Sequence, residues 1–104
     1  MQVQVNTDHN IQNSEALAAW VTGAIEDALA HTSDHITRVE VHLSDENGRK
    51  SGQNDKRCML EARLEGRHPI AVTEHADTLE QAVQEAAGKL ARMIESAAGK
   101  ATAS

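Results

Sequence analysis

The sequence is poor in aromatic residues and in cysteine. Among its 104 residues are one tryptophan, Trp20, and no phenylalanine or tyrosine. Proteins that hold unpaired bases stack them on aromatic rings, so this class of nucleic-acid binder is excluded. The single cysteine, Cys58, cannot form an internal disulfide, and no apolar run approaches the length of a membrane span. The sequence also shows no basic-then-apolar leader, so we expect a cytoplasmic protein with no membrane partner.

Positive charge is absent from the first third of the chain. Residues 1–35 carry five acidic residues and no lysine or arginine, residues 36–67 carry seven basic and six acidic residues, and residues 68–104 carry three basic and five acidic. The totals are 10 Lys and Arg against 16 Asp and Glu. An acidic chain argues against a general nucleic-acid binder. Because Trp20 is the only aromatic residue, any contact with nucleic acid would use phosphate groups and shape rather than base stacking.

The middle of the chain has the alternating pattern of half-buried strands. Apolar side chains recur at every second position in residues 39–43 and again in residues 58–64, which predicts two strands of one sheet. Residues 44–55 between them are polar and contain glycine, so they are predicted to form a long hairpin tip. Shorter β-prone runs at residues 2–6 and 70–73 predict two further strands.

Two segments have apolar residues at three- and four-residue spacing, as in helices with one buried face. The first is predicted to begin at Asn13 or Ser14, whose side chains can accept hydrogen bonds from the first free amides. The second is predicted to be about twenty residues long. It is expected to begin near Asp77, which stands three residues before Glu80 as in a capping box.

The resulting element order, β-α-β-β-β-α, predicts an α+β fold. Residues 1–98 should form one domain, and residues 99–104 a flexible tail. A right-handed crossover makes the first two strands parallel neighbours, and the remaining strands are antiparallel, which gives a four-stranded mixed sheet. Both helices are then expected to pack on one face. The other face is left open with mixed charges, carried by Arg38, Glu40, His42, Arg57, Met59, Glu61 and Arg63.

The histidines and the cysteine raise the hypothesis of a metal site. His31 and His35 stand four residues apart, but they fall where the first helix should end, and no further ligand pair with a recognisable spacing follows. Cys58 is expected to be a small buried hydrophobe, and Trp20 to pack at the edge of the core. The sequence has no glycine-rich phosphate loop and no serine elbow. We therefore predict no metal, no cofactor, no small-molecule substrate and no enzymatic activity.

Three segments match a known protein family in their order and spacing. They are MQVQVNTDHNIQNSEAL at the start, ITRVEVHLSDENG after the first helix, and ADTLEQAVQEAAGKLARMI near the end. In these segments the chain resembles the ribosome hibernation promoting factors, also called sigma-54 modulation or ribosome-associated inhibitor proteins, in a short form. The resemblance implies a protein that occupies the decoding channel of the small ribosomal subunit and inhibits translation in idle or stationary-phase cells.

The resemblance also implies which residues contact ribosomal RNA. Lys89 and Arg92 stand three residues apart on the second predicted helix, and Lys100 follows further along it. These three are the first candidates. Arg57 and Arg63, on the open face of the sheet, are the second.

The sequence departs from the family pattern in its basic residues. The first helix of the family usually carries lysine or arginine on its exposed face, whereas this chain has alanine or aspartate there. Conversely, basic residues flank the predicted hairpin tip. The basic residues that would contact RNA, here called the basic footprint, are therefore predicted to lie at the hairpin in this chain, where the family has them on the helices. The residues concerned are Ala18, Ala24 and Asp27 on the helix, and Arg49, Lys50, Lys56 and Arg57 at the hairpin.

A simpler interpretation remains open beside ribosome binding. In it, Lys89 and Arg92 only offset Glu85 and Glu95. The second hypothesis for the function is a protein-interaction module on the same fold that has lost ribosome binding. Its acidic first helix and mixed open face would engage a basic or mixed partner, with weak self-association through the sheet. A contiguous basic stripe on the folded protein would favour ribosome binding, and interspersed charges would favour the interaction module.

Overall fold

The computed structural model describes residues 1–46 and 55–103. It confirms the predicted α+β fold and element order. The predicted hairpin tip lies largely outside the described residues, as do Arg49 and Lys50. The elements are β1 (Gln2–Thr7), α1 (Glu15–Ala28), a short 3-10 helix η1 (Ser33–His35), β2 (Ile36–Asp45), β3 (Lys56–Leu64), β4 (Ile70–Ala76) and α2 (Leu79–Ala103).

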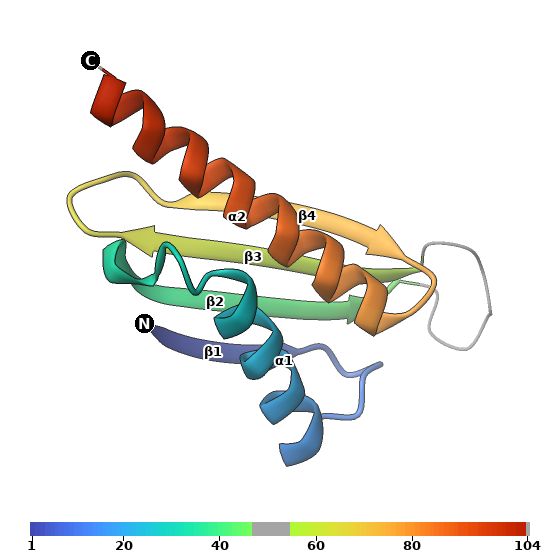
Figure 1. Ribbon diagram of the computed structural model, residues 1–104. Coiled ribbons are helices and arrows are strands. Elements are labelled where there is room, and N and C mark those ends of the chain that lie inside the picture. Colours follow the sequence, from blue (N-terminus) through green and yellow to red (C-terminus); the bar gives the residue numbers. More distant parts are fainter. Residues whose placement is uncertain (47–54, 104) are drawn as a thin grey trace.

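A single four-stranded sheet in the order β1-β2-β3-β4 organises the fold. β1 runs parallel to β2, with Val3 opposite Val39 and Val5 opposite Val41, as the crossover through α1 predicts. The other two pairings, β2 with β3 and β3 with β4, are antiparallel. Both helices lie on the same side of the sheet, with α2 running diagonally across β3 and β4 (Figure 1). The opposite face of the sheet is therefore left open, as predicted.

The core fills the layer between the sheet and the helices. Apolar side chains of β2, β3 and β4 alternate inward, where they meet the apolar stripes of both helices. Burying one such side chain contributes about 1.5–3 kcal/mol, so this layer supplies most of the stability. The fully buried members are Val21, Ile25, Leu29, Val39, Val41, Cys58, Leu60, Ala62, Ala82, Val83, Ala86 and Leu90.

The two helices begin with similar caps. At α1 the cap is Ser14, one of the two predicted residues, whose Oγ accepts a hydrogen bond from the Leu17 amide at 3.1 Å. At α2 the cap is Thr78 rather than the predicted Asp77, and its Oγ1 accepts from the Gln81 amide at 3.1 Å. Threonine followed three residues later by glutamine is itself a capping-box pair. The sequence signal was therefore present, but one residue further along.

β4 and α2 are longer than predicted. β4 continues to Ala76 and so includes Glu74, which lies just beyond the strand predicted at residues 70–73. Glu74 instead lies on the inward side, where its Oε1 is 3.3 Å from Lys89 Nζ on α2. An acidic residue can occupy this position because Lys89 neutralises it. α2 spans 25 residues and reaches Ala103.

Cys58 lies on the inward face of β3 and is fully buried, as predicted. Removal of the thiol from water disfavours its charged form, and burial raises the pKa of Cys58 from 9.0 to about 12. The neighbouring Arg57 acts in the opposite direction and is the weaker influence. The thiol is therefore protonated and unreactive in the folded protein at neutral pH.

Alkaline pH is expected to destabilise the fold through Cys58. Above the ordinary pKa of 9.0 the thiol ionises in the unfolded chain but keeps its proton in the folded one. The unfolded state then binds fewer protons, so the free energy of unfolding should fall by about 1.4 kcal/mol per pH unit up to about pH 12. Urea denaturation between about pH 8 and pH 11 would measure this fall. Cys58→Ala should lose less stability over the same range, and equal losses in both proteins would contradict the prediction.

Candidate nucleic-acid interface

The open face of the sheet carries a cluster of opposite charges where β2 begins and β3 ends. Arg38 Nη2 lies 3.3 Å from Glu40 Oε1, and Arg63 Nη2 lies 3.7 Å from Glu40 Oε2. Arg63 Nε also lies 3.4 Å from Glu61 Oε1. The register explains the arrangement, because Arg38 stands opposite Arg63 and Glu40 opposite Glu61. The predicted contact residue Arg63 is therefore already shared between two carboxylates, although its side chain is 56% exposed.

This arrangement is only partly visible in the sequence. Residues two apart on a strand share a face, so Arg38 with Glu40, and Glu61 with Arg63, can be recognised as neighbours. The reach of Arg63 to Glu40 depends on the register between β2 and β3, which the sequence alone does not give.

A second, looser cluster lies at the hairpin end of the same face. His75 Nε2 lies 3.0 Å from Glu46 Oε1, whereas Arg57 Nε lies 3.9 Å from that oxygen, too far for a hydrogen bond. Arg57 borders a hollow of about 220 Å³ whose lining includes His42 and Ser44. Within the described part of the chain, the buried Ser44 Oγ has no hydrogen-bond partner. Arg57 is thus held less firmly than Arg63 and stands beside an unused hydroxyl group.

The α2 candidates differ in their surroundings. Lys89 is paired with Glu74 at 3.3 Å, although its side chain is 47% exposed. Arg92 is also exposed, and it forms no ion pair with any residue that the structure describes. Its Nη1 folds back along the helix, to 3.5 Å from the point where a Cβ on Gly88 would stand. Lys100 lies within α2, and its side chain is outside the described residues.

Lys56, predicted to belong to a basic footprint at the hairpin, faces the core instead. Its Nζ donates a hydrogen bond to Asp45 Oδ2 at 2.7 Å and lies 3.7 Å from Asp55 Oδ2. The two carboxylates are only 7% and 5% exposed. The hydrogen bond with Asp45 raises the pKa of Lys56, and the charges of both aspartates add to this effect. Lys56 therefore neutralises buried acids at the base of the hairpin, which corrects that prediction.

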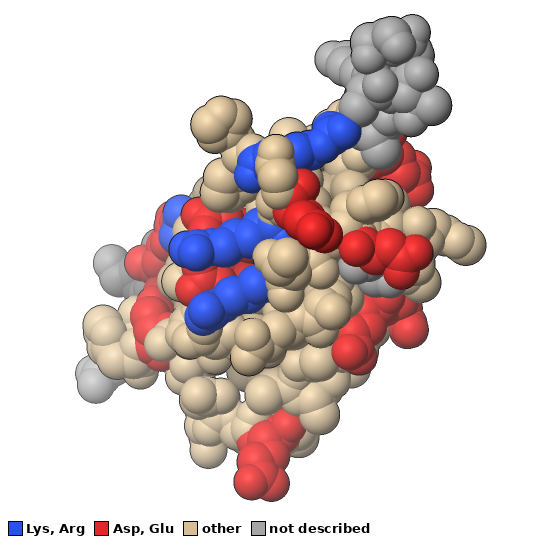
Figure 2. All heavy atoms as spheres, turned by 90° about the vertical axis from the view of Figure 1, so that its left-hand side faces the viewer, with Lys and Arg blue, Asp and Glu red and all other residues tan. Residues whose placement is uncertain are grey.

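Charges of both signs are interspersed on one face of the molecule. Seen from the left-hand end of Figure 1, Lys and Arg side chains gather on one part of the molecule with acidic side chains between them (Figure 2). The right-hand side of that view displays acidic groups. α1 contributes acidic residues and no lysine or arginine. On the face that Figure 2 shows, acidic side chains thus interrupt the basic ones among the described residues, which is the pattern expected of an interaction module.

The described residues form neither a metal-binding cluster nor a membrane-spanning helix. In the part of the chain that the structure describes, no group of three or more His, Cys, Asp or Glu side chains could hold a metal ion. His31 lies in the turn after α1, and His35 ends η1. Across those same residues, no helix combines the length and apolar character needed to cross a membrane.

Comparisons with known proteins identify relatives of the chain. Residues 4–102 match the family described as sigma 54 modulation protein / S30EA ribosomal protein. The fold is similar to the N-terminal domain of Protein Y from Thermus thermophilus, with a TM-score of 0.71 and 19% identity over 90% of this chain and 96% of that one. A ribosomal subunit interface protein from Coxiella burnetii gives a TM-score of 0.70 and 17% identity over 95% and 99% of the two chains. The comparison with curated proteins gave no significant match.

Proposed function

Because the chain belongs to the sigma 54 modulation protein / S30EA ribosomal protein family, we propose that it is a ribosome-associated factor without enzymatic activity. It binds the small ribosomal subunit in the decoding channel and inhibits translation in idle or stationary-phase cells. The family match over residues 4–102 is the observation that carries this proposal. The names of the two similar structures, a Protein Y domain and a ribosomal subunit interface protein, agree with it.

The primary contact in this proposal is α2, through Lys89, Arg92 and Lys100. Arg92 is the strongest of the three, because its guanidinium has no acidic partner among the described residues and can meet a phosphate without breaking an ion pair. Lys89 would exchange its contact with Glu74 for a phosphate, so its net gain is smaller.

The open face of the sheet supplies the secondary contact. Arg57 is favoured there, because its distance of 3.9 Å from Glu46 leaves it weakly held and its side chain is 37% exposed. Arg63 contributes less while two carboxylates hold it. With Trp20 as the sole aromatic residue, recognition relies on phosphates and on shape rather than on base stacking.

Binding of this kind should depend strongly on salt. Three phosphate contacts give a slope of log affinity against log salt of about −2.7, which is about a forty-fold loss between about 50 and 200 mM salt. The test is co-sedimentation with purified small ribosomal subunits over this range. Lys89→Gln, Arg92→Gln should bind at least about tenfold more weakly, with a slope shallower by about 1.8. Glutamine is chosen because a glutamate at position 89 would face Glu74.

A matched control separates local contact from net charge. Gln12→Glu, Asn13→Asp makes the same change in net charge at two exposed positions before α1, and it should bind as the wild type does. An equal loss in the control would mean that only overall charge matters. If the wild-type protein stays in the supernatant at low salt, the ribosomal function is wrong for this chain.

The second candidate function is a protein-interaction module on the same fold. The interspersed charges of the described surface favour it, as does the absence of basic residues from α1. It predicts no affinity for small ribosomal subunits at any salt concentration. The same co-sedimentation experiment therefore distinguishes the two functions.

A further inference from the structure

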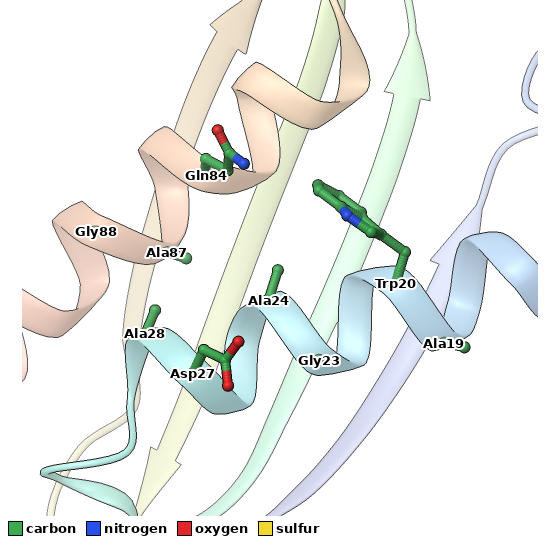
Figure 3. Close-up of a pocket in the computed structure, with 9 residues that line it drawn as sticks. All are labelled: Ala19, Trp20, Gly23, Ala24, Asp27, Ala28, Gln84, Ala87 and Gly88. Atoms are coloured by element: carbon green, nitrogen blue, oxygen red, sulfur yellow. The ribbon is translucent and has the colours of Figure 1, made fainter.

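A groove of about 610 Å³ lies between α1 and α2. Alanine and glycine residues of both helices form most of its walls, and three larger side chains, Trp20, Asp27 and Gln84, stand around it (Figure 3). Trp20 and Gln84 lean toward each other from the two helices. Trp20 is 37% exposed, although tryptophan is highly buried on average. Part of a large apolar ring is thus left uncovered at a concave site.

The groove exists because the helix surfaces that line it lack bulk. A Cβ built at Gly23 would meet no atom within 4 Å, so the space there is open. On the facing helix, Ala87 and Gly88 likewise present little or no side chain. A volume of this size is in the range of sites that bind apolar groups, about 300–1,000 Å³. Side chains of a partner can enter it without displacing the core.

The charges around the groove select the sign of that partner. Asp27 lines the groove and forms no ion pair with any residue in the described ranges. Glu95 follows Gly88 by seven residues, which places it on the same side of α2. Arg92 folds back beside Gly88 and is the cation that a basic partner would meet. Since α1 has no lysine or arginine, the balance at this end of the groove is acidic.

We propose that the groove between α1 and α2 docks an amphipathic, basic helix of a partner protein. Apolar side chains of that helix enter beside Trp20, and a lysine or arginine on its flank meets Asp27. A helix in a groove recurs in protein recognition, and a partly exposed tryptophan is a frequent anchor of such interfaces. This activity does not depend on ribosome binding. It assigns a role to the acidic helix, which a phosphate surface would repel.

Trp20 provides the readout for a direct test. It is the sole aromatic residue, so the intrinsic fluorescence of the protein comes from the edge of the groove. The probe is a synthetic helical peptide of leucine and lysine, about four turns long, compared with a leucine–glutamate peptide of the same pattern. As the leucine–lysine peptide is added, the Trp20 emission should shift to shorter wavelength, and the shift should saturate at high peptide concentration. The leucine–glutamate peptide should cause no such shift.

Substitutions then locate the contact. Asp27→Asn should weaken binding of the leucine–lysine peptide about threefold to fivefold, the upper part of the range of an exposed ion pair. Glu26→Gln makes the same change in charge on the same helix, but about 100° away around its axis, and should have no effect. Arg92→Gln should strengthen binding, the opposite of its expected effect on ribosome binding. Gly23→Leu should fill the groove and abolish the shift.

Several results would overturn the proposal. Equal emission shifts with both peptides would show that charge does not select the partner. Equal effects of Glu26→Gln and Asp27→Asn on peptide binding would show that the peptide does not bind in the groove. A shift that appears when the protein alone is concentrated, together with a larger mass by light scattering, would assign the groove to a second copy of the chain. Circular dichroism checks that Gly23→Leu is folded. If it is not, the comparison of Asp27→Asn with Glu26→Gln decides alone.

Discussion

Glu40→Gln is expected to tighten the binding of this protein to small ribosomal subunits about fivefold to tenfold at low salt. Glu40 holds two guanidinium groups, with Arg38 at 3.3 Å and Arg63 at 3.7 Å. Each exposed ion pair is worth about 0.2–1 kcal/mol, so losing the carboxylate lowers the cost of turning both arginines toward phosphates. Glutamine keeps the size of the side chain and removes its charge.

The salt dependence reports how many of these groups are engaged. Two additional phosphate contacts would steepen the slope of log affinity against log salt by about 1.8. Co-sedimentation of wild type and Glu40→Gln at several salt concentrations measures affinity and slope together. Glu26→Gln, on the exposed surface of α1, is the control for net charge and should tighten binding much less than Glu40→Gln does, with no change in slope. Equal affinities of Glu40→Gln and wild type would mean that the Arg38 and Arg63 end of the open face does not meet the RNA, and Arg63 would leave the candidate interface.

Leu90→Ala is expected to lower the free energy of unfolding by about 3 kcal/mol, within the range of about 2–5 kcal/mol for buried leucines. Leu90 lies on α2, is fully buried, and belongs to the layer that joins this helix to the sheet. The loss combines the transfer of apolar surface with the cavity left behind. Domains of this size have total stabilities of about 5–15 kcal/mol, so the variant should denature at a much lower urea concentration.

Met93→Ala on the same helix is the matched control. Its side chain is 40% exposed, so truncation removes little buried surface and should cost about 0.5 kcal/mol or less. Both variants keep Lys89 and Arg92. If the two variants lost similar stability, the difference in burial between Leu90 and Met93 would not determine the cost of truncating a side chain on α2.

The fold could be predicted from the sequence because the two-residue alternation in the strands and the three- and four-residue spacing in the helices each show which side of an element is buried. The alternation of Val39, Val41 and Leu43 fixes which face of β2 is buried, since a shift of one residue would expose all three. The three- and four-residue spacing in the helices gives each of them one buried side. With the crossover rule, these patterns leave one arrangement of the strands.

The predictions that failed concern side chains whose partners lie on a different helix or strand. Glu74 interrupts the apolar alternation of β4, and only the position of α2 brings Lys89 to it. Similarly, Lys56 is one of several basic residues near the hairpin in the sequence, but the pairing of β2 with β3 sets it opposite Asp45. Ion pairs between elements follow from register and packing, which residue patterns within one segment do not encode.

The candidate sites were less predictable than the fold. The candidates on α2 came from the family resemblance, and they remain predictions. The resemblance could not show that Arg92 lacks an acidic neighbour in the described residues while Arg63 has two. The groove could not be foreseen from Trp20, because it requires the small residues of two helices far apart in sequence to face each other.

The acidic helix α1 has a consequence for the kinetics of encounter with a polyanion. At a formal net charge of −6 the molecule as a whole is repelled by RNA, and the repulsion is strongest when α1 faces the RNA. Collisions are therefore productive only in the minority of orientations that present the basic side chains and turn α1 away. If the protein binds the ribosome as proposed, this charge asymmetry should act on the association rate more than on the lifetime of the complex, because it orients the protein before contact.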